Sequence, residues 1–162
     1  MAFETHTRRP LFDRLVDAEP WEHHDLGSAG GRTVERTLDK RGVLESIRRE
    51  LMRLFGTRSP RLFSELEELD RVRTVLDYGI PEVAQLSPAR PEDRERLAEV
   101  LRRTVEAYEP RLRHVTVDVE RIPEQPQALA IRIGGELRVE SVWEPVWFPV
   151  LMSRDAVQFL DR

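Results

Sequence analysis

The sequence predicts an α+β domain in which two long helices pack on one face of a small, mainly antiparallel sheet. Apolar residues recur at helical spacing up to residue 108 and alternate with polar residues from residue 114 onward. Pro110 stands at this change. Because proline lacks an N–H and disfavours a helical residue before it, the preceding helix should end by Glu109. The length of 162 residues suits one domain.

The first 41 residues are expected to form a flexible arm, and residues 42–162 the folded domain. Apolar residues cluster at positions 11–16, which predicts a short docking segment within the arm. Ser28-Ala29-Gly30-Gly31 has the composition of a linker. The adjacent pair His23-His24 lacks further ligands at metal-binding spacing, so we expect no metal site there.

The first long helix is predicted from an apolar stripe over residues 43–55, with Gly56 as its C-terminal cap and Pro60 blocking continuation. Ile47 and Leu51 belong to this stripe. The pattern fits a helix that faces the core, and it also fits a helix that offers an apolar face to a partner.

Between the two long helices we expect a short helical or turn segment over residues 62–69. A tight turn at Gly79, followed by an extended Ile80, is also expected, because Pro81 comes next. The second long helix is predicted over residues 91–108. Pro91 suits the first helical turn, and the acidic residues after it complement the helix dipole.

The remainder of the chain is predicted to be sheet. Gly134-Gly135 between two alternating segments indicates a hairpin turn, and Pro145 and Pro149 favour an edge position for the last strand. The tail, residues 153–162, is expected to add a helical turn. The predicted strands are residues 114–120, 128–133, 136–142 and an edge strand within 143–150.

Glu109 and Arg111 flank the corner between helix and sheet, and two interpretations of this pair are open. A surface ion pair would contribute at most about 1 kcal/mol. A desolvated pair would cost about 3–5 kcal/mol if one partner were removed, because the other charge would then be buried without compensation.

Composition excludes several classes of function. The net charge of −4 argues against general affinity for nucleic acid, and the absence of cysteine excludes thiolate chemistry and disulfides. No apolar run approaches the roughly 20 residues that a membrane helix needs. The first ten residues carry charge and no apolar segment of the kind a secretory signal has, so we expect a cytoplasmic protein.

Four segments, in this order, resemble the type VI secretion baseplate subunit family TssE, relatives of the phage baseplate wedge protein often labelled lysozyme-like. The resemblance spans roughly residues 10–140. The segments are Leu11-Phe12-Asp13-Arg14-Leu15, Ser46-Ile47-Arg48-Arg49-Glu50-Leu51 leading to Leu54-Phe55-Gly56-Thr57-Arg58, Val75-Leu76-Asp77-Tyr78-Gly79-Ile80-Pro81-Glu82, and Tyr108-Glu109-Pro110-Arg111-Leu112.

This resemblance implies structural work in a contractile injection machine. The chain would sit at the membrane-proximal baseplate, join other wedge subunits and link them to the sheath, with strands of sheath subunits added to an edge of its sheet. No cofactor, metal or small-molecule substrate is implied. The protein-binding residues implied are Ile47, Arg48 and Leu51 on the first long helix and Glu109, Pro110 and Arg111 at the corner.

The alternative is a peptidoglycan-cleaving glycosidase, as the lysozyme-like label suggests. Such an enzyme needs two carboxyl groups, about 5–5.5 Å apart if retaining or about 6.5–9.5 Å if inverting, with the pKa of one raised by an apolar pocket. Glu144, between Trp143 and Pro145, is the best candidate for an isolated carboxyl. A cytoplasmic location fits cell-wall cleavage poorly.

Overall fold

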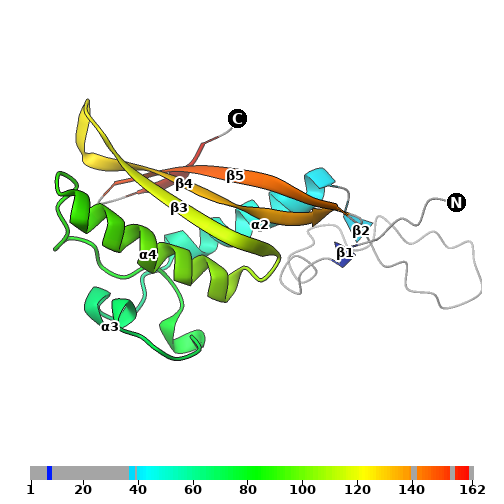
Figure 1. Ribbon diagram of the computed structural model, residues 1–162, viewed down its shortest axis with the longest axis horizontal. Helices are drawn as coiled ribbons and strands as arrows, with labels where there is room; N and C mark the ends of the chain where they lie inside the picture. The colour runs from blue at the N-terminus through cyan, green and yellow to red at the C-terminus, as the bar shows by residue number, and fades with distance from the viewer. Residues whose placement is uncertain (1–6, 9–36, 39, 140–141, 154–155, 161–162) are drawn as a thin grey trace, which may run out of the picture. The chain divides into compact units, whose positions relative to one another are not determined.

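The computed structural model describes residues 7–8, 37–38, 40–139, 142–153 and 156–160 (Figure 1). The chain divides into two units between Ser46 and Ile47, and each unit is described by itself. The docking segment, the histidine pair and the glycine linker predicted in the first 41 residues lie outside the described residues, so the flexible arm remains a prediction.

The first unit contains a two-stranded antiparallel pairing and the start of a helix. Strand β1 (Thr7–Arg8) pairs with β2 (Thr37–Leu38), with Thr7 opposite Leu38. Helix α2 (Lys40–Gly56) begins in this unit and continues into the second. Arg41 and Glu45 form an exposed ion pair at 3.2 Å on its first turns, the i,i+4 spacing that supports a helix.

The second unit is built on a four-stranded antiparallel sheet with strand order β3-β4-β5-β6 (Figure 1). Cross-strand pairing places Val119, Ile131, Val150 and Phe159 in one row across all four strands. This row belongs to the inward face of the sheet, where Ile131 and Val150 are buried. The strands are β3 (Leu112–Ile122), β4 (Gln125–Val139), β5 (Val142–Met152) and β6 (Val157–Phe159).

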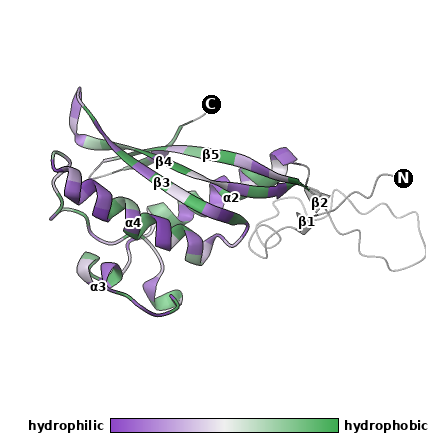
Figure 2. Cartoon of the chain, viewed as in Figure 1, coloured by the Kyte–Doolittle hydropathy of each residue, from purple (hydrophilic) through white to green (hydrophobic). Residues whose placement is uncertain are grey.

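Two long helices cover the inward face, as the sequence predicted. Helix α4 (Pro91–Tyr108) packs against β3, and Phe55 of α2 meets Phe159 of β6 edge-to-face with ring centroids 5.9 Å apart. Burial of these apolar side chains is the main stabilising contribution to the domain. In Figure 2 the outward turns of α4 are mostly hydrophilic, which confirms the amphipathic pattern.

The predicted hairpin at Gly134-Gly135 is wrong, because β4 runs through both glycines without a turn. The chain reverses earlier, where Ile122 pairs with Gln125. Gly134 is needed for close approach: a Cβ at this position would collide with the Trp147 ring and lie 2.6 Å from Thr116 Oγ1. Glycine within a strand can mark such an approach as well as a turn.

The prediction for the end of the chain is also wrong. Residues 157–159 form strand β6 where we expected a helical turn, because the alternation of Val157, Gln158 and Phe159 has the period of a strand. As a result β5 is an edge strand over only part of its length. The Leu160 N–H donates to the Pro149 carbonyl at 2.9 Å, so Pro149 turns its backbone toward β6 and its missing N–H breaks no bond to β4.

Two short helical segments link the long helices. Helix α3 (Phe63–Glu67) lies within the segment predicted as helix or turn, and the 3₁₀ helix η1 (Val75–Asp77) precedes the glycine turn. Gly79 has φ of +103°, which confirms the predicted tight turn. Gly56 ends α2 without a positive φ. None of the described helices is long and apolar enough to cross a membrane.

Candidate assembly site at the corner between helix and sheet

The corner forms where α4 ends and β3 begins. The Glu109 N–H donates to the Val105 carbonyl at 2.8 Å, which is the last helical bond, and the Leu112 N–H donates to the Glu109 carbonyl at 3.1 Å. Pro110 lies between these bonds and is exposed. The predicted helix end at Glu109 is confirmed, since Tyr108 is the last helical residue.

Glu109 and Arg111 form a desolvated pair. Arg111 Nε donates to Glu109 Oε1 at 2.6 Å, Arg111 Nη2 donates to Oε2, and the Arg111 backbone N–H donates to Oε1 at 3.2 Å. The Glu109 side chain is 3% exposed and that of Arg111 is 20% exposed. The interpretation as a surface ion pair is therefore wrong. The two charges bind each other in a largely buried position.

The corner is joined to the segment around Tyr78. The rings of Tyr78 and Tyr108 meet edge-to-face with centroids 5.1 Å apart, and the Tyr108 hydroxyl donates to the Thr74 carbonyl at 2.7 Å. The end of α4 is thus anchored to η1. Thr74 and Tyr108 are 34 residues apart in the sequence, and this bond brings their segments together.

The segment around Gly79 is joined in turn to the end of α2. The Ile80 N–H donates to the Thr57 carbonyl at 2.8 Å, and the Ser59 N–H donates to the Ile80 carbonyl at 2.9 Å. This isolated parallel bridge brings the two segments of the chain so close that a Cβ on Gly79 would lie 2.5 Å from Thr57 O. Next to it, Arg58 and Glu82 form an exposed ion pair at 2.5 Å.

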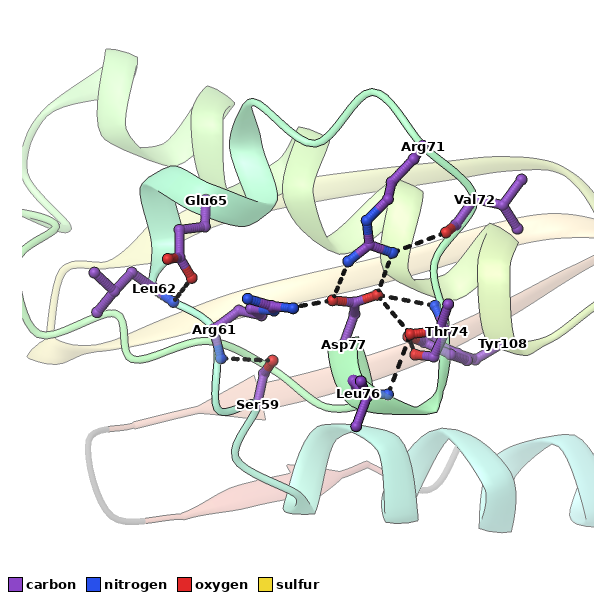
Figure 3. Close-up of polar contacts among 10 residues, drawn as sticks. All are labelled: Ser59, Arg61, Leu62, Glu65, Arg71, Val72, Thr74, Leu76, Asp77 and Tyr108. Carbon is purple, nitrogen blue, oxygen red and sulfur yellow. Dashed lines mark hydrogen bonds and ion pairs between the residues drawn. The ribbon is translucent and has the colours of Figure 1, made fainter.

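Asp77 organises the loop between α3 and α4. Its side chain is fully buried, yet it receives hydrogen bonds from two arginines and from Thr74 (Figure 3). Arg71 donates through both terminal nitrogens at 2.8 and 2.9 Å, and Arg61 Nε donates at 3.1 Å. The Thr74 N–H and hydroxyl donate to Oδ2 at 2.9 and 3.1 Å. Five donors thus satisfy the buried carboxylate.

These contacts lower the pKa of Asp77 well below its ordinary value of 3.8. The bidentate hydrogen bond from Arg71 is the largest cause, followed by the Thr74 N–H. Because the folded-state pKa is lowered, Asp77 contributes stability above its ordinary pKa and loses this contribution as pH falls from about 4 toward the folded-state value. Salt bridges from Arg102 and Arg103 lower the pKa of Glu99 to about 2, so Glu99 acts in the same direction.

Replacing Asp77 with asparagine is expected to lower the melting temperature at neutral pH and to flatten its dependence on pH below about 4. The amide cannot accept from both arginines as a carboxylate does. Thermal melts of wild type and Asp77→Asn between pH 2 and 7 measure both effects. Glu99→Gln on α4 is the control for loss of another low-pKa carboxyl. An unchanged acid slope in Asp77→Asn would contradict the assignment.

The structure places the three predicted binding residues of α2 in or beside the core. Ile47 and Leu51 are fully buried, and Arg48 Nη2 donates to the Phe159 carbonyl at 2.9 Å. The hydrogen bond from Arg48 holds α2 against the end of β6. A direct role for these residues in partner binding remains a prediction, as it does for Glu109, Pro110 and Arg111.

Asp77, Tyr78 and Gly79 were not selected as site residues from the sequence, although they lie in one of the four resembling segments. Their place in that segment is the feature of the sequence that points to them. Spacing could not show that Asp77 is buried, because its donors Arg61 and Arg71 lie in irregular segments on either side of α3. Three of the four segments meet in space, through the parallel bridge at Ile80 and the ring contact at Tyr78.

The chemistry of the described charged groups is that of mutual pairing. The carboxyl groups whose pKa values depart from the ordinary range, Asp77, Glu67, Glu82 and Glu99, all have lowered values caused first by arginine hydrogen bonds. Among the described residues no group of His, Cys, Asp and Glu is arranged to hold a metal ion. In each of these four carboxyl groups the arginine hydrogen bond favours the charged form.

The fold and the site define an α+β domain in which arginine–carboxylate pairs hold its loops and helix ends. The sequence matches the model of a family described as baseplate wedge protein gp25 over residues 41–142, which is more than half of the chain. The chain belongs to this family, which includes TssE. A search of curated proteins gave no match.

Proposed function

We propose that the chain is a baseplate component of a type VI secretion machine and links the wedge complex to the sheath. Membership of the baseplate wedge family carries this proposal, because assembly with other baseplate proteins follows from it. The contacts between the corner at Glu109–Arg111 and the Tyr78 segment support it. Three segments of the resemblance form one surface that is held by buried charges and backbone bonds, and a rigid surface loses little entropy on binding.

In this role the chain lies in the cytoplasm at the membrane-proximal baseplate, and it has no catalytic activity. The lowered pKa values of the shifted carboxyl groups favour this role over the glycosidase alternative, which needs a raised one.

The attachment to the sheath is proposed to use the open edge of β3. An edge strand presents unpaired N–H and C=O groups to which another strand can add. Strand β3 is eleven residues long and contains no proline. Strand β6, at the opposite edge, has three residues, which leaves little length for pairing.

The uncovered part of β5 is a poorer acceptor than β3. Pro149 directs its backbone toward β6, as its bond from Leu160 shows. Backbone groups of alternate residues in a strand point the same way, so Trp147 and Pro145 face this open side too. Pro145 has no N–H to donate to an added strand. These missing donors favour β3 as the site of strand addition.

A crosslinking experiment tests this proposal. The chain has no cysteine, so a single introduced cysteine carries a benzophenone maleimide at one known position. Glu120→Cys places the probe on β3, and Gln158→Cys places it on β6 as a matched control; both positions are exposed. In assembled baseplates we expect Glu120→Cys to crosslink to a sheath subunit and Gln158→Cys to give no such adduct. Sheath adducts from β6 alone, or from neither position, would refute attachment at β3.

A further inference from the structure

The outward face of the sheet carries an exposed tryptophan close to two arginines. Arg138 of β4 is directly opposite Trp143 of β5. Arg113 of β3 pairs with Glu136, two residues from Arg138 on the same face, so its side chain shares that face. We name Arg113, Arg138 and Trp143 the cationic platform.

The Trp143 ring is held in place and still accessible. The guanidinium carbon of Arg113 lies 4.6 Å from its ring centroid, a cation–π contact. The residue is 38% exposed. Tryptophan and arginine are also the residues most enriched among those that dominate binding energy at protein interfaces.

Neither arginine of the platform has a carboxylate partner among the described residues. Arg113 makes only its contact with the Trp143 ring, and Arg138 makes no ion pair there. Glu136, the acidic residue between them, lies 3.8 Å from His114. The platform therefore presents two guanidinium groups whose hydrogen-bonding capacity is unused within this part of the chain.

A second tryptophan on the same face provides an internal comparison. Trp147 is 43% exposed and has Arg132 at 5.8 Å from its ring centroid. Arg132, however, is already paired with Asp118 at 3.4 Å. Both tryptophans of β5 thus contact an arginine. The charge of Arg132 at Trp147 is compensated by Asp118, whereas that of Arg113 at Trp143, in the platform, has no carboxylate partner among the described residues.

We propose that the cationic platform binds an acidic segment of another baseplate protein, with carboxylates on Arg113 and Arg138 and an apolar side chain on the Trp143 ring. Guanidinium groups bind carboxylates bidentately, and stacking on the ring orients Arg113 before binding, which reduces the entropy lost. A nucleic acid is a poorer fit, because the platform offers two cations on a chain of net charge −4. This site uses side chains on the outward face of the sheet, whereas the sheath is proposed to pair with the backbone edge of β3, the strand that carries Arg113.

The test is photocrosslinking in assembled baseplates with p-benzoylphenylalanine in place of Trp143, an exchange of one aromatic side chain for another. Mapping of the adduct is expected to identify a protein segment in which acidic residues outnumber basic ones. The same replacement at Trp147 is the control and is expected to give a weaker adduct. Raising the salt concentration should reduce the Trp143 yield, because exposed charges are screened.

Charge reversal decides whether the arginines are responsible. Arg113→Glu with Arg138→Glu is expected to reduce the crosslink yield at position 143 at least about tenfold. Arg121→Glu, which changes an exposed arginine on the same strand as Arg113, should change the yield less than about twofold.

Melting curves verify that each variant folds; if the double reversal unfolds, Arg113→Gln with Arg138→Gln replaces it. The proposal is overturned by an adduct to a segment without excess acidic residues, to nucleic acid, to lipid or to a second copy. The absence of any adduct, or a yield that survives the double reversal, overturns it as well.

Discussion

Replacing Arg111 with alanine is expected to destabilise the domain by about 3–5 kcal/mol, because Glu109 would keep a buried charge without its guanidinium partner. Of the hydrogen bonds described for this carboxylate, only that from the Arg111 backbone N–H at 3.2 Å would remain. Urea or thermal denaturation of the purified protein measures the loss. Sheath assembly should fail in the same variant, since the corner that carries the start of β3 is no longer fixed.

Two variants separate the buried charge from other effects of the substitution. Glu109→Gln with Arg111→Met removes both charges and keeps similar volumes, so most of the lost stability should return. Arg41→Ala breaks the exposed pair with Glu45 and should cost less than about 1 kcal/mol. If Arg111→Ala were no more harmful than Arg41→Ala, the pair would not be the desolvated element described here.

The second large effect is expected at Gly79, where alanine should cost at least about 1–3 kcal/mol through the positive φ alone. The residue has φ of +103°, and a Cβ would lie 2.5 Å from Thr57 O and 2.9 Å from Ser59 N. Both atoms belong to the backbone, so no side chain can move aside. We expect Gly79→Ala to separate the end of α2 from the Ile80 segment, with a lower melting temperature and faster amide exchange at Ser59 and Ile80.

Gly56→Ala is the matched control for this prediction. Gly56 ends α2, and a Cβ there would meet nothing within 4 Å. Alanine should therefore leave the stability unchanged or raise it by up to about 1 kcal/mol, because it restricts the unfolded chain and favours the helix. A similar loss of stability in both variants would mean that the geometry at Gly79 is not the cause.

The parts of the fold that the sequence predicted are those with a clear period. The apolar stripes of α2 and α4 repeat every three to four residues, and the stop at Pro110 follows from the covalent structure of proline. The wrong predictions concern residues whose type is compatible with two structures, as glycine is with a turn and with a close approach inside a strand. Gly134 lies under the Trp147 ring in a continuous strand, and nothing in the local sequence distinguishes this from a turn. The short β6 pairs with β5, and an alternation of three residues is too short to predict a strand without this tertiary contact.

For the site, the position of Glu109 and Arg111 at the corner could be predicted from the sequence, but their burial could not. Whether such a pair is exposed depends on which elements cover it, and this is decided by packing of distant segments. The same limit applies to Asp77, whose environment is made by Arg61 and Arg71 across an irregular loop. Ile47 and Leu51 show the reverse case, because an apolar stripe alone does not reveal whether it faces the core or a partner.

The prolines of β5 have a consequence for the subunit before it meets any partner. A free copy with two open sheet edges could polymerise with other copies edge to edge, and the assembly would then lose subunits to aggregates. Pro145 removes a donor from the uncovered part of β5, and the pairing of β3 with β4 is interrupted near His114, which has φ of 49°. Such interruptions make identical edges poor templates for each other. We expect these features to limit edge-to-edge pairing between free subunits.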